Sequence, residues 1–219
     1  TPYHHPVFAD QVEPSAEFVE TINEVCAREG IVLILDDIRV GFRLSVHGSH
    51  GRYGWQPDLA CYCKAMANGY PVSATVGRQA LRVAASKVFL TGSYWNGAAG
   101  LAAALKTLEI LERDDVPAAL DRAGRRLCDG LVALGETHGI PLIATGPGAA
   151  PFVRVANETN FARQQQWTTA AMQPVEGSAA AFFHPHHNWF TCAAHTDAEI
   201  DAALAIADRA LAQASDASD

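Results

Sequence analysis

The sequence has no long hydrophobic run and no stretch rich in basic residues, and each absence excludes a class of function. No apolar segment approaches the roughly 20 residues that a membrane-spanning helix requires. The 16 lysines and arginines are outnumbered by 24 acidic residues, and the formal net charge is -8. A chain without a basic face lacks the electrostatic footprint of proteins that bind nucleic acid or anionic membranes. We therefore expect neither nucleic acid nor a membrane as a partner.

Cysteine is sparse, and the start of the chain lacks the pattern of a secretory signal. The first residues, Thr1-Pro2-Tyr3-His4-His5, contain neither a basic nor an apolar segment. The cysteines are five in number and scattered, which predicts reduced thiols and no disulfide framework. Cys61 and Cys63 point the same way if they lie on a strand, so they form either a metal or redox pair or, as we favour, part of the core. These features predict a cytoplasmic protein.

The composition is that of a globular α/β protein. Of the 219 residues, 49% are apolar and 18% are charged, which suits one or two domains. In the first part of the chain, helical and strand patterns alternate, which predicts a mainly parallel sheet. From residue 140 onwards, short strand patterns alternate with helices and predict a smaller α+β domain. We therefore expect one domain at residues 1–139 and another at 140–219.

Hydrophobic periodicity and end signals predict the individual elements. A glycine, Gly30, ends the first helix, and Gly139 ends another. Thr196 and Glu199 form a capping box for the last helix. Helices are expected at 16–29, 80–87, 98–112, 114–137, 159–172 and 197–213, and strands at 31–35, 59–63, 73–76, 141–144, 151–155, 181–184 and 189–193.

Two of the expected strands end in residues that can carry chemistry. The run 31–35 is followed by Asp36 and Asp37, and the run 59–63 is followed by Lys64. Adjacent parallel strands bring their carboxyl ends to one edge of the sheet, where open α/β sheets bind ligands. An acid or a lysine at a single strand end is usually a surface residue, so the neighbouring motifs decide whether this pair is a site.

Five motifs follow one another between residues 36 and 78. They are Asp36-Asp37-Ile38-x-x-Gly41-Phe42-Arg43, Tyr53-Gly54-x-x-Pro57-Asp58-Leu59, Lys64-Ala65, Gly69-Tyr70-Pro71 and Gly77-Arg78. In this order they resemble the class III aminotransferases among the fold-type I enzymes that use pyridoxal 5′-phosphate (PLP), including the glutamate-1-semialdehyde aminomutase branch. The resemblance implies the PLP-transferase fold type I, with part of its large domain at 1–139 and its small domain at 140–219.

The resemblance also implies roles for four residues. Lys64 forms the Schiff base with PLP and moves the proton. Asp36 binds the pyridine nitrogen and favours the protonated ring, and Ile38 packs against the ring face. Ser93 stands where the family usually has a threonine that binds the cofactor phosphate of a neighbouring subunit. The implied function is amino-group transfer between small molecules, as an aminotransferase or a 2,1-aminomutase.

This chain departs from the family pattern in residue type and in length. Asp37 replaces the usual glutamate. Arg39 adds a cation near the ring site and either meets a substrate carboxylate or pairs with Asp37. Family members are about twice as long, and their N-terminal half, with the phosphate cup and the first strands of the large sheet, is absent here. We therefore expect a homodimer or a complex with a chain that carries that half.

Two other functions are compatible with the sequence. In the first, the chain is a non-catalytic remnant or scaffold that assembles with a partner. In the second, which is remote, the histidines near the C-terminus bind a metal ion. The aminomutase-like branch explains the same histidines without a metal, so we expect no metal site. These histidines are His184, His186, His187 and His195.

Overall fold

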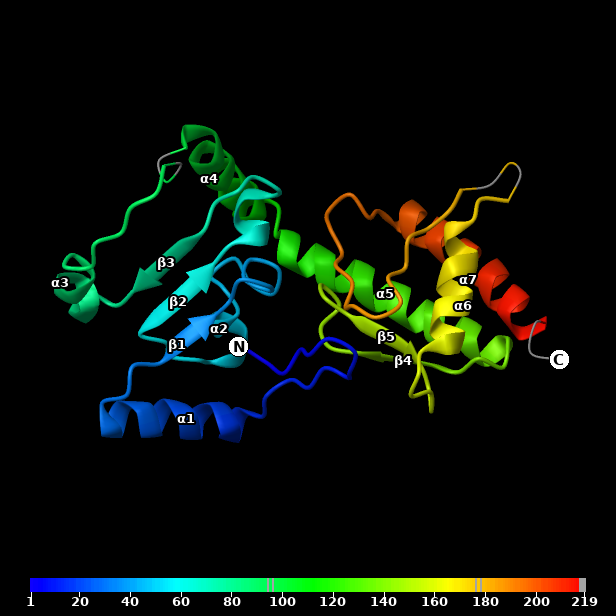
Figure 1. Cartoon of the computed structure of the whole chain (residues 1–219), viewed down its shortest axis with the longest axis horizontal. Helices are drawn as coiled ribbons and strands as arrows, with labels where there is room; N and C mark the ends of the chain where they lie inside the picture. Colours follow the sequence, from blue (N-terminus) through cyan, green and yellow to red (C-terminus); the bar gives the residue numbers. More distant parts are fainter. Residues whose placement is uncertain (94, 96, 176, 178, 217–219) are drawn as a thin grey trace. The chain divides into compact units, whose positions relative to one another are not determined.

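A computed structural model describes residues 1–93, 95, 97–175, 177 and 179–216 (Figure 1). The chain forms two compact units. Unit 1 comprises Thr1–His4 and Glu13–Pro117, and unit 2 comprises His5–Val12 and Ala118–Asp219. Within the described part of the chain, no helix combines the length and the apolar character needed to cross a bilayer.

Unit 1 is built on a three-stranded sheet. Strand β1 (Ile34–Asp36) pairs in parallel with β2 (Leu59–Tyr62), and β2 pairs antiparallel with β3 (Ala74–Gly77). The expected mainly parallel sheet is therefore mixed. The connection from β2 to β3 spans residues 63–73, which is shorter than the crossover of a dozen or more residues that parallel pairing requires.

Helix α1 (Ala16–Glu29) of unit 1 begins and ends at signals present in the sequence, whereas the helix expected at 80–87 is a 3₁₀ turn followed by one short helix. Helix α1 starts after Ser15, whose hydroxyl accepts a hydrogen bond from the backbone N–H of Phe18 at 3.2 Å. It ends at Gly30, which adopts a left-handed conformation with φ 66°. The remaining helices are α2 (His50–Tyr53), α3 (Arg82–Ala85), α4 (Ala98–Arg113) and two 3₁₀ helices, η1 (Lys64–Ala67) and η2 (Gln79–Leu81).

The sheet of unit 1 has one buried face and one open face. Leu35 and its register partner Ala60 lie on the buried face, in a small core that also contains Val19 of α1. The open face carries the alternate residues of the same strands: Ile34, Asp36, Leu59, Cys61 and Thr75. Ile34 is 56% exposed there, so part of this sheet presents apolar side chains to solvent.

Unit 2 combines helices with a β-hairpin. It contains most of α5 (Val116–Thr137), then β4 (Leu142–Thr145) paired antiparallel with β5 (Phe152–Val155), then α6 (Ala162–Met172) and α7 (Asp197–Asp216). The capping box of α7 is confirmed, because the carboxylate of Glu199 accepts hydrogen bonds from the backbone N–H and the hydroxyl of Thr196.

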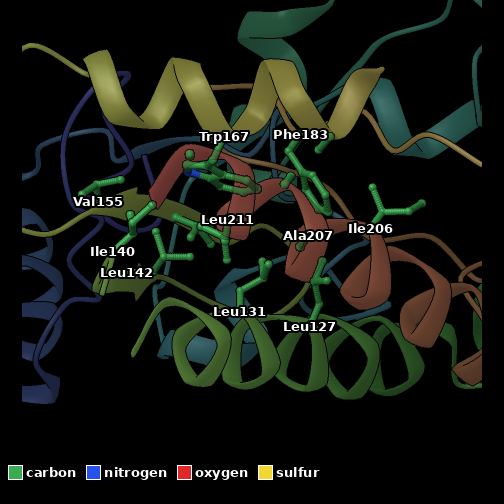
Figure 2. Close-up of a cluster of buried hydrophobic side chains, with 14 of the residues drawn as sticks. Leu127, Leu131, Ile140, Leu142, Val155, Trp167, Phe183, Ile206, Ala207 and Leu211 are labelled. Atoms are coloured by element: carbon green, nitrogen blue, oxygen red, sulfur yellow. The ribbon is translucent and has the colours of Figure 1, made fainter. Parts of the chain in front are cut away.

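The elements of unit 2 enclose a continuous core. Figure 2 shows side chains from α5, α6, α7 and the hairpin converging on one apolar cluster. Trp167 of α6, Leu131 of α5 and Leu211 of α7 have no exposed surface. The indole N–H of Trp167 donates to Oε1 of the equally buried Gln164 at 3.0 Å, so the polar atom of this large side chain is satisfied within the core.

Two features of unit 2 differ from the expectations. The expected boundary at residue 139 falls inside the unit, because α5 packs its buried face into this core and belongs with it. The expected strands at 181–184 and 189–193 are irregular backbone. Single hydrogen bonds, such as Trp189 N–H to the carbonyl of Pro151 at 2.7 Å, replace a ladder. Pro185, which has no N–H to donate, lies between them.

Candidate functional site

The carboxyl ends of β1 and β2 bring the two candidate site residues to the same edge of the sheet. Asp36 is the last residue of β1 and lies opposite Cys61 of β2. Lys64 follows the end of β2 at Tyr62 by two residues and opens η1. Because these strands run parallel, both residues lie beyond the same end of the sheet, as the sequence predicted.

The carboxylate of Asp36 is held by its own turn. Its Oδ1 accepts a hydrogen bond from the backbone N–H of Ile38 at 3.1 Å. Asp36 is exposed on the open face of the sheet, while Ile38 is half-buried. The turn therefore holds an exposed carboxylate two residues before a half-buried, branched apolar side chain.

Lys64 occupies an unusual backbone conformation. Its φ is 45°, in the left-handed region that few residues with a side chain adopt. The following residues, Met66 and Ala67, are buried in the small core and anchor η1, while Lys64 itself is exposed. Such outliers persist where the surrounding structure fixes them, and they concentrate at functional sites. The anchored 3₁₀ turn thus displays a primary amine at the strand end.

Asp37 and Arg39 take up different surroundings. Asp37 is completely buried and bonds to Ser49, with its Oδ1 2.7 Å from the hydroxyl oxygen. The positive charge of Arg39 acts on Tyr3, where it opposes the rise in the pKa of the Tyr3 hydroxyl that burial causes. Ser49 is thus the hydrogen-bond partner of the Asp37 carboxylate.

Ser93 lies outside this pair. It is exposed in the segment between α3 and α4, and none of the hydrogen bonds described for this part of the chain joins it to Asp36 or Lys64. Its expected function is to bind the phosphate of a neighbouring subunit, which one chain does not test. The role of Ser93 stays a prediction.

Two of the motifs stabilise the opposite edge of the sheet. The backbone N–H of Arg78 donates to the carbonyl of Asp58 at 2.9 Å, and its guanidinium lies 3.6 Å from the Asp58 carboxylate. The same carboxylate accepts a hydrogen bond from the backbone N–H of Leu33 at 2.8 Å. These motif residues therefore join the starts of β1 and β2 to the end of β3, and their role here is structural.

An apolar groove lies along the open face of the sheet. It has a volume of about 670 Å³. Its walls are the sheet and the segment that contains η2 and α3, and its apolar lining includes Val32, Leu59, Leu81, Val88 and Leu90. The groove lies over the start of β2 and the end of β3, on the same open face of the sheet that carries Asp36 further along β1.

In the described ranges, no three or more His, Cys, Asp or Glu side chains are grouped so as to hold a metal ion. Nδ1 of His184 accepts hydrogen bonds from the backbone N–H groups of His186 and His187, at 3.1 and 3.0 Å. This histidine therefore organises a turn. All five cysteines are free thiols.

Comparison with known proteins identifies the family. The model of the class III aminotransferases matches residues 10–173. An aminopentol aminotransferase from Sphingopyxis macrogoltabida is 38% identical over 210 residues, covering 96% of this chain and 49% of that protein. A glutamate-1-semialdehyde 2,1-aminomutase from Desulfatibacillum aliphaticivorans is 31% identical over 212 residues, covering 92% and 50%. The aminotransferase is the more similar of the two.

A solved structure agrees with this assignment. The FumI protein of Sphingopyxis sp. MTA144, in its PLP internal aldimine form, superposes with a TM-score of 0.91 at 37% identity and covers 97% of this chain and 50% of its own. The chain thus spans about half the length of the relatives it matches. The chain has the fold of the corresponding half of a fold-type I PLP transferase, and it belongs to the class III aminotransferase family.

Proposed function

We propose that this chain carries the lysine-bearing half of a PLP-dependent aminotransferase. In this proposal Lys64 binds the cofactor covalently, Asp36 pairs with its ring nitrogen, and Ile38 packs on its ring face. The observation that carries the proposal is the parallel pairing of β1 and β2, which puts Asp36 and Lys64 at one edge of the sheet. Membership of the family supplies the chemistry that this pair fits.

The residues at the strand ends fit the cofactor. PLP, when bound, acts as an electron sink for the carbanion of an amine substrate. The Asp36 carboxylate, fixed by the N–H of Ile38, would favour protonation of the ring nitrogen. The amine of Lys64, once displaced by the substrate amine, is the base that would take the proton from the substrate Cα.

We infer the substrate class and the reaction type from the more similar relative. That relative is named as an aminopentol aminotransferase. We propose transfer of an amino group from an amino alcohol to a carbonyl acceptor, in preference to the internal amino shift of the aminomutase. Ser93 would contribute its hydroxyl to the phosphate site of a second subunit, in a homodimer or in a complex with a chain that carries the N-terminal half.

The alternative is a non-catalytic half that assembles with a partner and does not use PLP. The open face of the sheet and its groove favour it for the chain in isolation. Selective capture of the cofactor distinguishes the two, because a pure scaffold has no need of a reactive lysine at the strand end.

Reductive trapping tests the proposal. The chain has three lysines, Lys64, Lys87 and Lys106, so the site of labelling can be read from one peptide digest. After incubation with PLP and reduction with borohydride, we expect the label on Lys64 in preference to the other two. Lys64→Ala should lose the label, whereas the control variants Lys87→Ala and Lys106→Ala should keep it. Equal labelling of all three lysines would contradict the proposal.

A further inference from the structure

Asp37 is a buried carboxylate directly beside the candidate catalytic acid. It has no exposed surface, and neither has Ser49, twelve residues further along the chain. Its Oδ2 accepts a hydrogen bond from the backbone N–H of Ser49 at 2.7 Å, and its Oδ1 accepts one from the Ser49 hydroxyl at 2.7 Å. We call this pair of bonds the Asp37–Ser49 clasp.

The backbone of Asp37 is fixed on both sides. Its N–H donates to the carbonyl of Cys61 at 3.0 Å, which extends the pairing of β1 with β2 by one residue. Its carbonyl accepts from the N–H of Gly41 at 2.9 Å. Side chain and backbone together therefore join the end of β1, the end of β2 and the loop 41–49.

The loop approaches the strand ends too closely for side chains. Gly48 has φ 88°, and a Cβ there would lie 2.5 Å from the Tyr62 hydroxyl oxygen and 3.1 Å from Oδ2 of Asp37. A Cβ on Gly41 would lie 2.6 Å from the Asp37 carbonyl oxygen. The loop thus packs against Tyr62, which is the last residue of β2 and precedes Lys64 by two positions.

Burial of a carboxylate at this position is energetically unfavourable, because the charged group loses its hydration. Burial raises the pKa of Asp37, although both hydrogen bonds from Ser49 and the charge of His50 lower it. Nδ1 of His50 is itself buried without a hydrogen-bond partner among the described residues. Apolar residues of similar volume often replace buried charges without loss of stability, so stability alone does not account for an acid here.

The effect of the clasp reaches Asp36 through one turn. The Ile38 N–H that orients the Asp36 carboxylate belongs to the residue on the other side of Asp37. A rotation of Asp37 would therefore turn Asp36 and Ile38 together. This short mechanical connection distinguishes Asp37 from the other buried residues of unit 1.

We infer that Asp37 is a positioning residue, whose clasp with Ser49 fixes the direction of the Asp36 carboxylate and of Ile38 at the ring-binding edge. The importance of that direction for PLP rests on the proposed function. The clasp itself is a property of the chain and can be tested without the cofactor.

Amide hydrogen exchange followed by NMR on the whole chain tests this inference. Hydrogen bonds to charged groups contribute roughly 1.5–3 kcal/mol, so Asp37→Asn should speed exchange at Ser49 and Ile38 by about tenfold or more, after correction for global stability. Ser49→Ala keeps the backbone bond to Oδ2 and should give a smaller change. This milder variant keeps the test valid if Asp37→Asn does not fold.

Two further variants separate positioning from packing. Asp37→Glu keeps the charge but adds a methylene group, whereas Asp37→Asn keeps the shape and loses the charge. If Asp37 is a positioning residue, the Glu variant should protect the Ile38 amide from exchange better than the Asn variant. If Asp37 only fills space, the Asn variant should protect it better. Asp58→Asn is the matched control, because Asp58 holds the Leu33 N–H at the opposite edge of the same sheet. It should speed exchange at Leu33 and leave Ile38 unchanged.

The exchange rates test the role of Asp37, and the trapping of PLP tests the proposed function. The inference is overturned if Ile38 exchanges no faster in Asp37→Asn and Ser49→Ala than in Asp58→Asn, or if Asn protects it better than Glu. Trapping of PLP on Lys64 of the unmodified chain is measured separately. Its failure would count against the proposed function while the exchange rates still decide the role of Asp37.

Discussion

The two units are similar in length but differ in how completely they bury their apolar residues. The large apolar side chains with less than 2% exposure lie mainly in unit 2, including Trp167, Phe152 and Leu131. In unit 1, apolar residues stay in contact with solvent along the open face of the sheet and along the segment from α3 to α4. These include Ile31, Val32, Ile34, Val83, Val88, Phe89, Leu90, Trp95, Leu101 and Leu105.

The candidate site lies on the less complete unit. Unit 2 supplies its own cover through α5, α6 and α7. Unit 1 presents Asp36 on the face of the sheet that has no cover. Large exposed apolar patches mark interaction sites. In our account, the remaining half of the family fold covers this face and completes the cofactor site in the same step.

The largest expected effect is a difference between two matched core substitutions. Leu131 of unit 2 and Leu35 of unit 1 are 0% and 3% exposed, and removal of a buried leucine side chain typically costs about 2–5 kcal/mol. We expect Leu131→Ala near the upper end of that range and Leu35→Ala near the lower end, because the thin sheet of unit 1 can relax and admit water. Urea unfolding measures both.

The comparison between the units would fail if the order were reversed. A cost at Leu35→Ala as large as that at Leu131→Ala would mean that unit 1 is as tightly packed as unit 2.

A smaller effect concerns the exposed aromatics. Phe89 of unit 1 is 88% exposed and Phe182 of unit 2 is 73% exposed. Phe89→Ser should reduce self-association of the chain, because Phe89 lies among other exposed apolar residues of unit 1, whereas Phe182→Ser is the control and should change it little. Both surface variants should alter the free energy of unfolding by less than about 0.5 kcal/mol. Light scattering over a concentration series measures self-association, and equal behaviour of the two variants would refute this role of Phe89.

The smallest effect is a pH dependence within unit 2. Desolvation, and then the charges of His187 and His186, lower the pKa of His184 below its ordinary value of 6.5. The neutral ring accepts the two backbone N–H bonds of its turn, so its stabilising contribution is complete above pH 6.5 and is lost as the pH falls through the lowered pKa. The protection of the His186 and His187 amides, measured relative to the intrinsic exchange rate at each pH, should therefore fall on acidification.

A substitution of His184 provides the control for this prediction. His184→Asn keeps a side-chain acceptor for the same N–H groups but does not titrate. The substitution should remove the pH dependence of amide protection at His186 and His187, and it should leave amide protection in unit 1 unchanged. Identical pH profiles for the two proteins would show that another group controls this turn.

Much of the fold could be predicted because its signals are local. The helix ends at Gly30 and at the Thr196–Glu199 box depend on neighbouring residues, and the structure has them. The strands expected at 181–184 and 189–193 depended on apolar content alone. Their aromatic side chains, Phe183 and Trp189, are indeed packed on the core, but the turn around His184 and Pro185 prevents a ladder.

The candidate site was predictable only in part, because only some of its features depend on residues that are neighbours in the sequence. Asp36 and Lys64 could be located because apolar runs end at them. The burial of Asp37 could not, because its partner Ser49 lies twelve residues away and reaches it only through the close approach of the loop at Gly48. The one available signal was the pair Gly48-Ser49 in a long loop that follows an acid.

The most direct test of the account is the behaviour of the unmodified chain with PLP. Chromatography at low micromolar concentration, with simultaneous light scattering and cofactor absorbance, gives the mass and the PLP content of the same species. We predict that the chain alone does not retain stoichiometric PLP as a monomer, because the face beside Asp36 and Lys64 is uncovered. A well-folded monomer saturated with PLP would contradict the account.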